Sequence, residues 1–117
     1  MRQFEEVVRA LEALKAERKF NAEGLYPGAP SEAVRLRCEA RVNQWLAVLI
    51  QASPQSLAPD RVLAQFRTLL PAFDDEDTDE RERVGAYCEK ILEILGIASS
   101  DGVLNTWLYG FDPNSAG

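Results

Sequence analysis

Residues 77–97 read DTDERERVGAYCEKILEILGI, and this stretch shows more plainly than any other which fold the chain adopts. Its apolar residues recur every three or four positions, the period of an α-helix, and leave the charged residues on the opposite face. The apolar positions are Val84, Tyr87, Cys88, Ile91, Leu92, Ile94 and Leu95. Asp77 and Glu80 have the spacing of a capping box, and Gly96 followed by Ile97 is typical of a Schellman stop. The pattern predicts one long amphipathic helix between these two signals.

The same helical period appears on both sides of this stretch. It predicts helices at about residues 3–18, 31–52 and 59–70, and a short C-terminal helix after Ser100. No segment alternates apolar and polar residues as a half-buried strand does. We therefore expect an all-α fold: a compact single-domain bundle over residues 1–117, with four longer helices and one short C-terminal helix.

Two connections are longer than the others, and both termini are expected to fray. The loop 19–30 contains Gly and Pro helix breakers, and Leu25 and Tyr26 are expected to hold it against the body of the protein. The second connection is an acidic linker, residues 71–77. Residues 45–50 are apolar on nearly every side, so the helix that contains them is expected to be the central and most buried one.

The composition excludes several classes of protein. The chain has 117 residues and is 46% hydrophobic, yet no apolar run approaches the roughly 18 residues that cross a membrane. Its start lacks a signal-peptide pattern, which predicts a cytoplasmic protein that does not associate with membranes. There is no histidine and there are two cysteines, so Ser-His or Cys-His catalytic pairs and structural zinc sites are excluded. We expect no metal, no cofactor and no enzymatic activity.

Charge is distributed unevenly along the chain, whose net charge is −6. Residues 1–58 hold 8 Lys and Arg against 7 Asp and Glu, whereas residues 59–117 hold 5 against 12. An acidic half repels phosphates, which argues against nucleic acid as a partner. It suits a basic protein partner. The plainer interpretation is that the charge keeps a small protein in solution.

The acidic residues concentrate in residues 74–82, where seven of nine positions are Asp or Glu. The acidic run consists of Asp74, Asp75, Glu76, Asp77, Asp79, Glu80 and Glu82. Carboxylates are favoured at the start of a helix, which accounts for Asp77, Asp79 and Glu80. The three acids before Asp77 are not needed for this purpose. The run is therefore predicted to be a docking patch for a basic surface.

A calcium site is the other interpretation of the run. Asp75, Asp77 and Asp79 have the alternate spacing that opens an EF-hand loop. Glu80 then stands where the loop needs glycine, and Ala86 stands where it needs a bidentate glutamate. Since the rest of the pattern fails, no metal site is predicted here.

Arg37 and Arg41 are one helical turn apart, and Arg41 falls within the apolar face of its helix. A guanidinium group in that position must be paired or must reach water. We expect an internal ion pair, for example with the acidic run. The alternative is that the two side chains bind a small anion, either a carboxylate or a phosphate.

Aromatic residues gather in the C-terminal segment Trp107-Leu108-Tyr109-Gly110-Phe111. Trp107 is in phase with the apolar face of the short helix and is expected in the core. Tyr109 and Phe111 are candidates for exposed contacts with a partner. The two cysteines lie within apolar faces and are expected to be buried thiols rather than a redox switch.

A resemblance to a known family lies near the C-terminus. The matching segments are Ser99-Ser100-Asp101-Gly102-Val103-Leu104-Asn105, Trp107-Leu108-Tyr109-Gly110-Phe111 and the preceding Asp79-Glu80-Arg81-Glu82-Arg83. Together they resemble the C-terminal end of a small bacterial family of unknown function, over roughly residues 78–117. The resemblance implies a bacterial source and a helical fold, and it implies no activity and no functional residues.

These observations predict a non-catalytic, acidic interaction protein that binds a basic protein partner, as an adaptor, a chaperone or an immunity-type neutraliser does. Its predicted contact residues are Asp74, Asp75, Glu76, Asp77, Asp79, Tyr109 and Phe111. The alternative is a homodimeric structural or regulatory protein with an apolar helix face as its interface. A second alternative is a small-anion binder or enzyme that uses Arg37 and Arg41.

Overall fold

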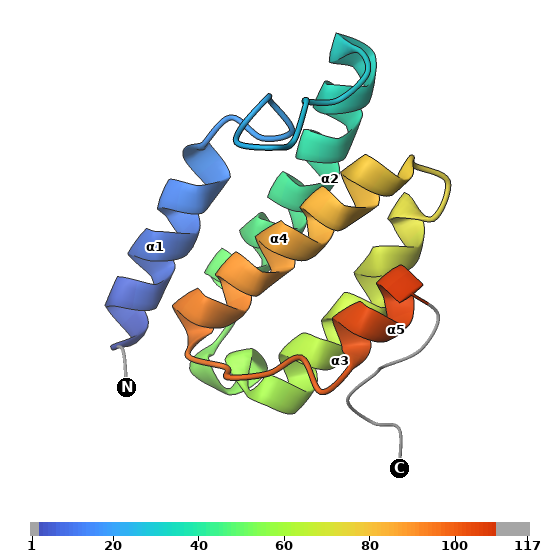
Figure 1. Cartoon of the computed structure of the whole chain (residues 1–117). Coiled ribbons are helices and arrows are strands. Elements are labelled where there is room, and N and C mark those ends of the chain that lie inside the picture. Colours follow the sequence, from blue (N-terminus) through green and yellow to red (C-terminus); the bar gives the residue numbers. More distant parts are fainter. Residues whose placement is uncertain (1–2, 110–117) are drawn as a thin grey trace.

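The computed structural model describes residues 3–109 and contains five α-helices and two 3₁₀ helices within that range (Figure 1). The elements are α1 (Phe4–Ala16), α2 (Glu32–Gln51), η1 (Pro54–Leu57), α3 (Pro59–Leu69), η2 (Leu70–Phe73), α4 (Thr78–Leu95) and α5 (Val103–Tyr109). The described residues form no strand beyond an isolated bridge between Glu23 and Tyr26. The predicted all-α bundle of four longer helices and one short C-terminal helix is confirmed.

The helices pack around one hydrophobic core to which all five contribute. α2 packs along α1, α4 packs against α1 and α5, and α5 lies against α3. In Figure 1, α4 crosses in front of α2, with α1 on one side and α5 on the other. Fully buried side chains in this core include Leu11 of α1, Leu46 of α2, Phe66 of α3 and Ile91 of α4. None of the helices in residues 3–109 is long and apolar enough to cross a membrane.

Two helix ends follow the signals in the sequence. Ser31 begins α2 as predicted, and its hydroxyl oxygen accepts a hydrogen bond from the Val34 amide at 3.2 Å. α4 ends in a Schellman motif, with Gly96 at φ +73° and the Ile97 amide bonded to the Leu92 carbonyl at 2.9 Å. Because glycine adopts a positive φ without steric cost, this residue determines where α4 stops.

The predicted capping box at the start of α4 is wrong. Asp77 occupies the N-cap position, but its side chain makes no capping hydrogen bond. Glu80 is buried and accepts a hydrogen bond from the Tyr26 hydroxyl at 2.9 Å. The loop between α1 and α2 therefore takes the carboxylate that a capping box would have used.

Three expectations about burial also need correction. Leu25 is fully exposed, so Tyr26 alone of the two residues holds the loop against the body. Residues 45–50 are not buried on all sides, since Val48 is 58% exposed. α4 is the more buried helix, with seven buried residues among 18 against six among 20 in α2. The linker 71–77 begins within η2 and carries the fully buried Phe73.

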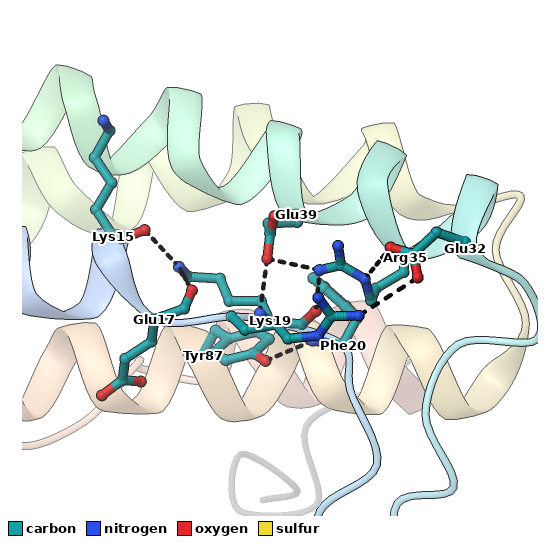
Figure 2. Close-up of polar contacts among 9 residues, drawn as sticks. Lys15, Glu17, Lys19, Phe20, Glu32, Arg35, Glu39 and Tyr87 are labelled. Carbon is teal, nitrogen blue, oxygen red and sulfur yellow. Dashed lines mark hydrogen bonds and ion pairs between the residues drawn. The ribbon is translucent and has the colours of Figure 1, made fainter.

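The connection between α1 and α2 is held by polar contacts in the interior (Figure 2). The Glu39 carboxylate accepts a hydrogen bond from the Lys19 amide at 2.8 Å and another from Arg35 at 2.9 Å. The hydroxyl oxygen of Tyr87 in α4 accepts the amide of Phe20 at 2.9 Å, and Phe20 has a φ of +61°. These bonds hold a non-glycine residue in a left-handed conformation inside the core.

Lys19 is fully buried in this connection although it carries an amino group. The side chain donates hydrogen bonds to the carbonyls of Lys15 and Glu17, at 3.0 and 2.9 Å, at the C-terminal end of α1. A positive group there complements the helix dipole. Burial lowers the pKa of Lys19, against the raising effect of the Glu39 charge. The two backbone carbonyls satisfy the buried amino group and hold the side chain in place.

Candidate functional site

The acidic run lies at the turn between η2 and α4, and the structure divides it into two groups. Three carboxylates bind other residues of the chain, those of Glu76 and Glu80 in part-buried or buried sites and that of Asp74 at the surface. Asp74 accepts a hydrogen bond from the indole nitrogen of Trp107 at 2.8 Å. This bond brings the end of α5 to the first residue of the run.

Glu76 is the centre of an ion-pair cluster that joins α2 to the run. Arg37 donates two hydrogen bonds to it, at 3.0 Å from Nε and 2.7 Å from Nη2. Arg41 lies 3.4 Å from Glu76 and donates to the Ala72 carbonyl at 2.8 Å. The hydrogen bond from Arg37, together with both guanidinium charges, holds the pKa of Glu76 below its usual value. The internal ion pair expected for the two arginines is therefore present.

Glu80 lies further along the run, inside α4, and has the opposite electrostatic environment. Its side chain is 2% exposed and has the Tyr26 hydroxyl as its hydrogen-bond donor. Burial raises the pKa of Glu80, and the charges of Asp77 and Asp79 raise it further, against the effect of that hydrogen bond. Burial likewise raises the pKa of Tyr26. The pair ties the long loop to α4 and is not available to a partner.

The second group of carboxylates faces solvent. It consists of Asp75, Asp77, Asp79 and Glu82, which we call the acidic patch. Within residues 3–109 these four side chains have no ion pair and no hydrogen bond. Asp79 and Glu82 border a depression of about 220 Å³ whose apolar walls are Leu25, Tyr26, Pro27 and Ala86. Negative charge thus lies beside a fully exposed leucine.

The aromatic residues near the C-terminus differ in how far they are buried. Trp107 is half-buried, and its indole nitrogen reaches Asp74 at the surface, so it is only partly a core residue. Tyr109 is 59% exposed and stands two residues further along α5. Residues two apart on a helix point to different sides, so the bond between Trp107 and Asp74 does not bring the Tyr109 side chain to the acidic run. Phe111 lies outside the described residues.

Both cysteines are buried free thiols, as predicted. Burial, together with the Glu76 charge, raises the pKa of Cys38 to about 12. Burial also raises the pKa of Cys88. Neither thiol suits a redox role, because the reactive form is an accessible thiolate. In the part of the chain that the structure describes, no three Cys, Asp or Glu side chains are grouped so that they could hold a metal ion.

A larger depression lies between α2 and α3. We call it the α2–α3 groove; its volume is about 650 Å³, and its lining residues are Arg41, Gln44, Trp45, Val48, Ala64, Gln65, Thr68, Leu69 and Ala72. Sequence reasoning missed it, because a helical period shows which side chains are apolar but not which neighbour covers them. The available signal was the surplus of apolar side chains over residues 45–50, more than one core-facing side of a helix can bury.

The molecule is thus a small helical bundle with an exposed acidic patch and an open apolar groove. The chain belongs to the family described as a domain of unknown function, DUF4844, which matches residues 2–112. It is also similar to the crystal structure of a DUF3571 family protein from Acinetobacter baumannii, with 32% sequence identity, 89% of each chain covered and a TM-score of 0.75. No curated protein matches the sequence.

Family membership extends well beyond the segments that first suggested it. The sequence resemblance covers the C-terminal end, whereas the family match begins at residue 2 and spans nearly the whole chain. A family of unknown function is therefore confirmed, and the match does not test the C-terminal motif. Neither comparison assigns an activity, a partner or functional residues.

Proposed function

We propose that this protein is a non-catalytic interaction protein that binds a basic protein surface through its acidic patch. The observation that carries the proposal is the division of the acidic run. Asp74, Glu76 and Glu80 have partners inside the molecule, so the fold accounts for them. The four carboxylates of the patch are exposed and close in sequence, with no basic partner in residues 3–109, and the start of α4 accounts only for Asp77 and Asp79.

Apolar side chains beside the patch support a protein partner. Leu25 is fully exposed in the depression that Asp79 and Glu82 border. Tyr109 is exposed on α5. At protein interfaces, apolar and aromatic side chains supply much of the binding free energy, while charges steer the encounter and select the partner. A partner surface on which basic side chains surround an apolar side chain would complement these carboxylates and exposed apolar residues.

This proposal narrows the set of contact residues. Asp75, Asp77, Asp79 and Tyr109 remain in it, and Leu25 and Glu82 join them. Asp74 and Glu76 leave it, since their carboxylates hold α5 and α2 in place. An adaptor, a chaperone or an immunity-type neutraliser in the bacterial cytoplasm would have this character, an analogy that rests on size and charge.

The test is a pull-down from lysate of the source organism at low and high salt. The bait is the wild-type chain beside a patch variant carrying Asp75→Asn, Asp77→Asn, Asp79→Asn and Glu82→Gln. We expect the wild type to retain a basic protein that high salt releases, because salt screens exposed charge pairs. The purified partner should bind the patch variant at least about tenfold more weakly, the combined effect of four exposed charge contacts.

A matched variant separates the patch from net charge. It carries Glu5→Gln, Glu12→Gln, Glu89→Gln and Glu93→Gln, which are exposed carboxylates elsewhere on the surface. Both variants change the net charge from −6 to −2. A partner that the matched variant binds and the patch variant loses supports the proposal. Equal binding to the two variants, or capture of no basic protein by the wild type, overturns it.

The homodimer alternative rests on a separate observation. Leu36 and Val48 of α2 are 51% and 58% exposed. Large exposed apolar side chains are a feature of protein interfaces. A molar mass that rises with protein concentration in sedimentation equilibrium favours this function over the first.

A further inference from the structure

The α2–α3 groove has the form of a small-molecule site. Arg41, Trp45 and Val48 of α2 are spaced at i, i+4 and i+7, so they follow one side of that helix. Ala64 and Leu69 of α3 form the facing wall. Its volume of about 650 Å³ is in the range of ligand-binding clefts. An open, mostly apolar trough is therefore built on two rigid helices.

The groove is polar at one end and apolar at the other. Arg41 donates to the Ala72 carbonyl at 2.8 Å, which marks the polar end. The indole nitrogen of Trp45 donates to Gln65 at 3.3 Å across the middle, and Val48 lines the far end with 58% of its surface exposed. From Arg41 to Val48 the helical rise corresponds to about 10 Å. An occupant should therefore have one charged end and a short apolar chain.

The polar end of the groove has more positive charge than the neighbouring carboxylate neutralises. Arg37 satisfies Glu76 with two hydrogen bonds, at 3.0 and 2.7 Å, whereas Arg41 makes only a 3.4 Å contact with the same carboxylate. Two guanidinium groups thus share one carboxylate. A guanidinium carries five N–H donors, and both hydrogen bonds of Arg41 use Nη1. With 37% of its side chain exposed, Arg41 can also donate to a bound anion.

We propose that the α2–α3 groove binds a free medium-chain carboxylic acid in its ionised form. The carboxylate lies against Arg41, and the acyl chain runs along Trp45 to Val48. Positive charge at one end selects an anionic head, and the apolar walls remove the chain from water. This site is separate from the acidic patch, and neither proposal depends on the other.

The test uses octanoate as the probe and the full chain as the protein. Octanol has the same chain without the charge, and acetate has the charge without the chain. Tryptophan fluorescence reports the groove through Trp45, and a Trp107→Phe variant confirms that the signal does not come from Trp107. We expect saturable binding of octanoate, about tenfold weaker binding of octanol, and no binding of acetate in the same range.

Two arginine variants locate the head group. Arg41→Gln should weaken octanoate binding about tenfold and leave octanol binding unchanged, which also shows that the groove remains folded. Arg61→Gln is the matched control, because Arg61 is exposed on α3 and does not line the groove. Failure of octanoate to bind, equal affinity for octanol and octanoate, or equal effects of the two substitutions overturns the proposal.

A second copy of the chain is the competing occupant. Val48→Glu places a carboxylate at the apolar end of the groove, at an exposed position that tolerates it. If the groove binds octanoate, this variant loses binding while the molar mass stays that of a monomer. The proposal is wrong, and the groove is an interface between two copies, if three results are found together. The wild type sediments as a dimer, Val48→Glu sediments as a monomer, and octanoate does not dissociate the wild-type dimer.

Discussion

At the scale of single residues, two glutamates of the same run show how position decides the charge state of a side chain. Glu76 lies beside two guanidinium groups that stabilise its ionised form, whereas Glu80 lies in a buried site with a tyrosine hydroxyl. Their pKa values therefore shift in opposite directions. Ionised Glu76 stabilises the fold above its unfolded pKa, and this contribution is lost as the pH falls through its folded pKa.

Glu80→Gln is expected to stabilise the protein at neutral pH. The folded pKa of Glu80 is raised, so its contribution is present below the unfolded pKa of about 4.3 and is lost as the pH rises through the folded pKa. Glutamine is neutral throughout and can still accept the Tyr26 hydrogen bond. Urea unfolding should show a gain of about 1 kcal/mol at pH 7 and little gain at pH 4.

Glu82→Gln is the matched control for this prediction, because Glu82 is an exposed glutamate on the same helix. Its effect on the free energy of unfolding should stay within about 0.5 kcal/mol at both pH values. If Glu80→Gln behaves like the control, or destabilises the protein at pH 7, then burial of the ionised carboxylate is not a cost to the fold.

At the scale of elements, capping residues in the sequence predict a helix end correctly where no neighbouring element binds the same side chain. Ser31 and Gly96 act on the backbone of their own helices, and both ends were predicted from the sequence. Asp77 and Glu80 have an equally recognisable spacing, but Tyr26 from a distant loop takes the glutamate. The capping box therefore fails although its residues are present.

Gly96→Ala is expected to lower the free energy of unfolding by about 1–2 kcal/mol, because a Cβ disfavours the left-handed conformation. The residue has φ +73°, and a Cβ built there would meet no atom within 4 Å, so the cost is one of backbone conformation. Thermal unfolding measures it. Gly96→Asn should cost less, since asparagine tolerates this conformation; an equal cost for both would show that conformation is not the cause.

At the scale of the whole molecule, one core links all five helices. The radius of gyration is 14.2 Å, close to the roughly 13 Å of a compact domain of about 100 residues. Cys38 of α2 and Cys88 of α4 lie in this core and are 0% and 1% exposed. Since the same core buries both thiols, they should become accessible in one cooperative transition.

Thiol labelling is therefore expected to follow global unfolding. Burial keeps both thiols out of reach of an aromatic disulfide reagent and raises the pKa of each, so the folded protein should react slowly. The labelling rate should rise with urea in parallel with the unfolded fraction. Cys38→Ser and Cys88→Ser allow each thiol to be measured alone. Fast labelling of Cys38 without urea would show instead that the N-terminal half of α2, which contains Cys38, opens locally.

The candidate sites were predictable only in part, for reasons visible in particular residues. Arg41 falls in an apolar face, which predicts an internal partner, and opposite charge in the run predicts where that partner is. The exposure of Leu25 and Val48 was not predictable, because both are apolar and lie in segments that the pattern places in the interior. Whether an apolar side chain is covered depends on another element.

The helical class, the five α-helices and the positions of their clearest ends could be predicted from the sequence alone. Helical period and capping act within a few neighbouring residues, so they can be read along the chain. Tertiary structure alone decided which carboxylates of the run pair internally, where Leu25 lies and that α2 and α3 leave a groove between them. Those properties depend on contacts between residues distant in sequence, such as Arg41 with Glu76 and Tyr26 with Glu80.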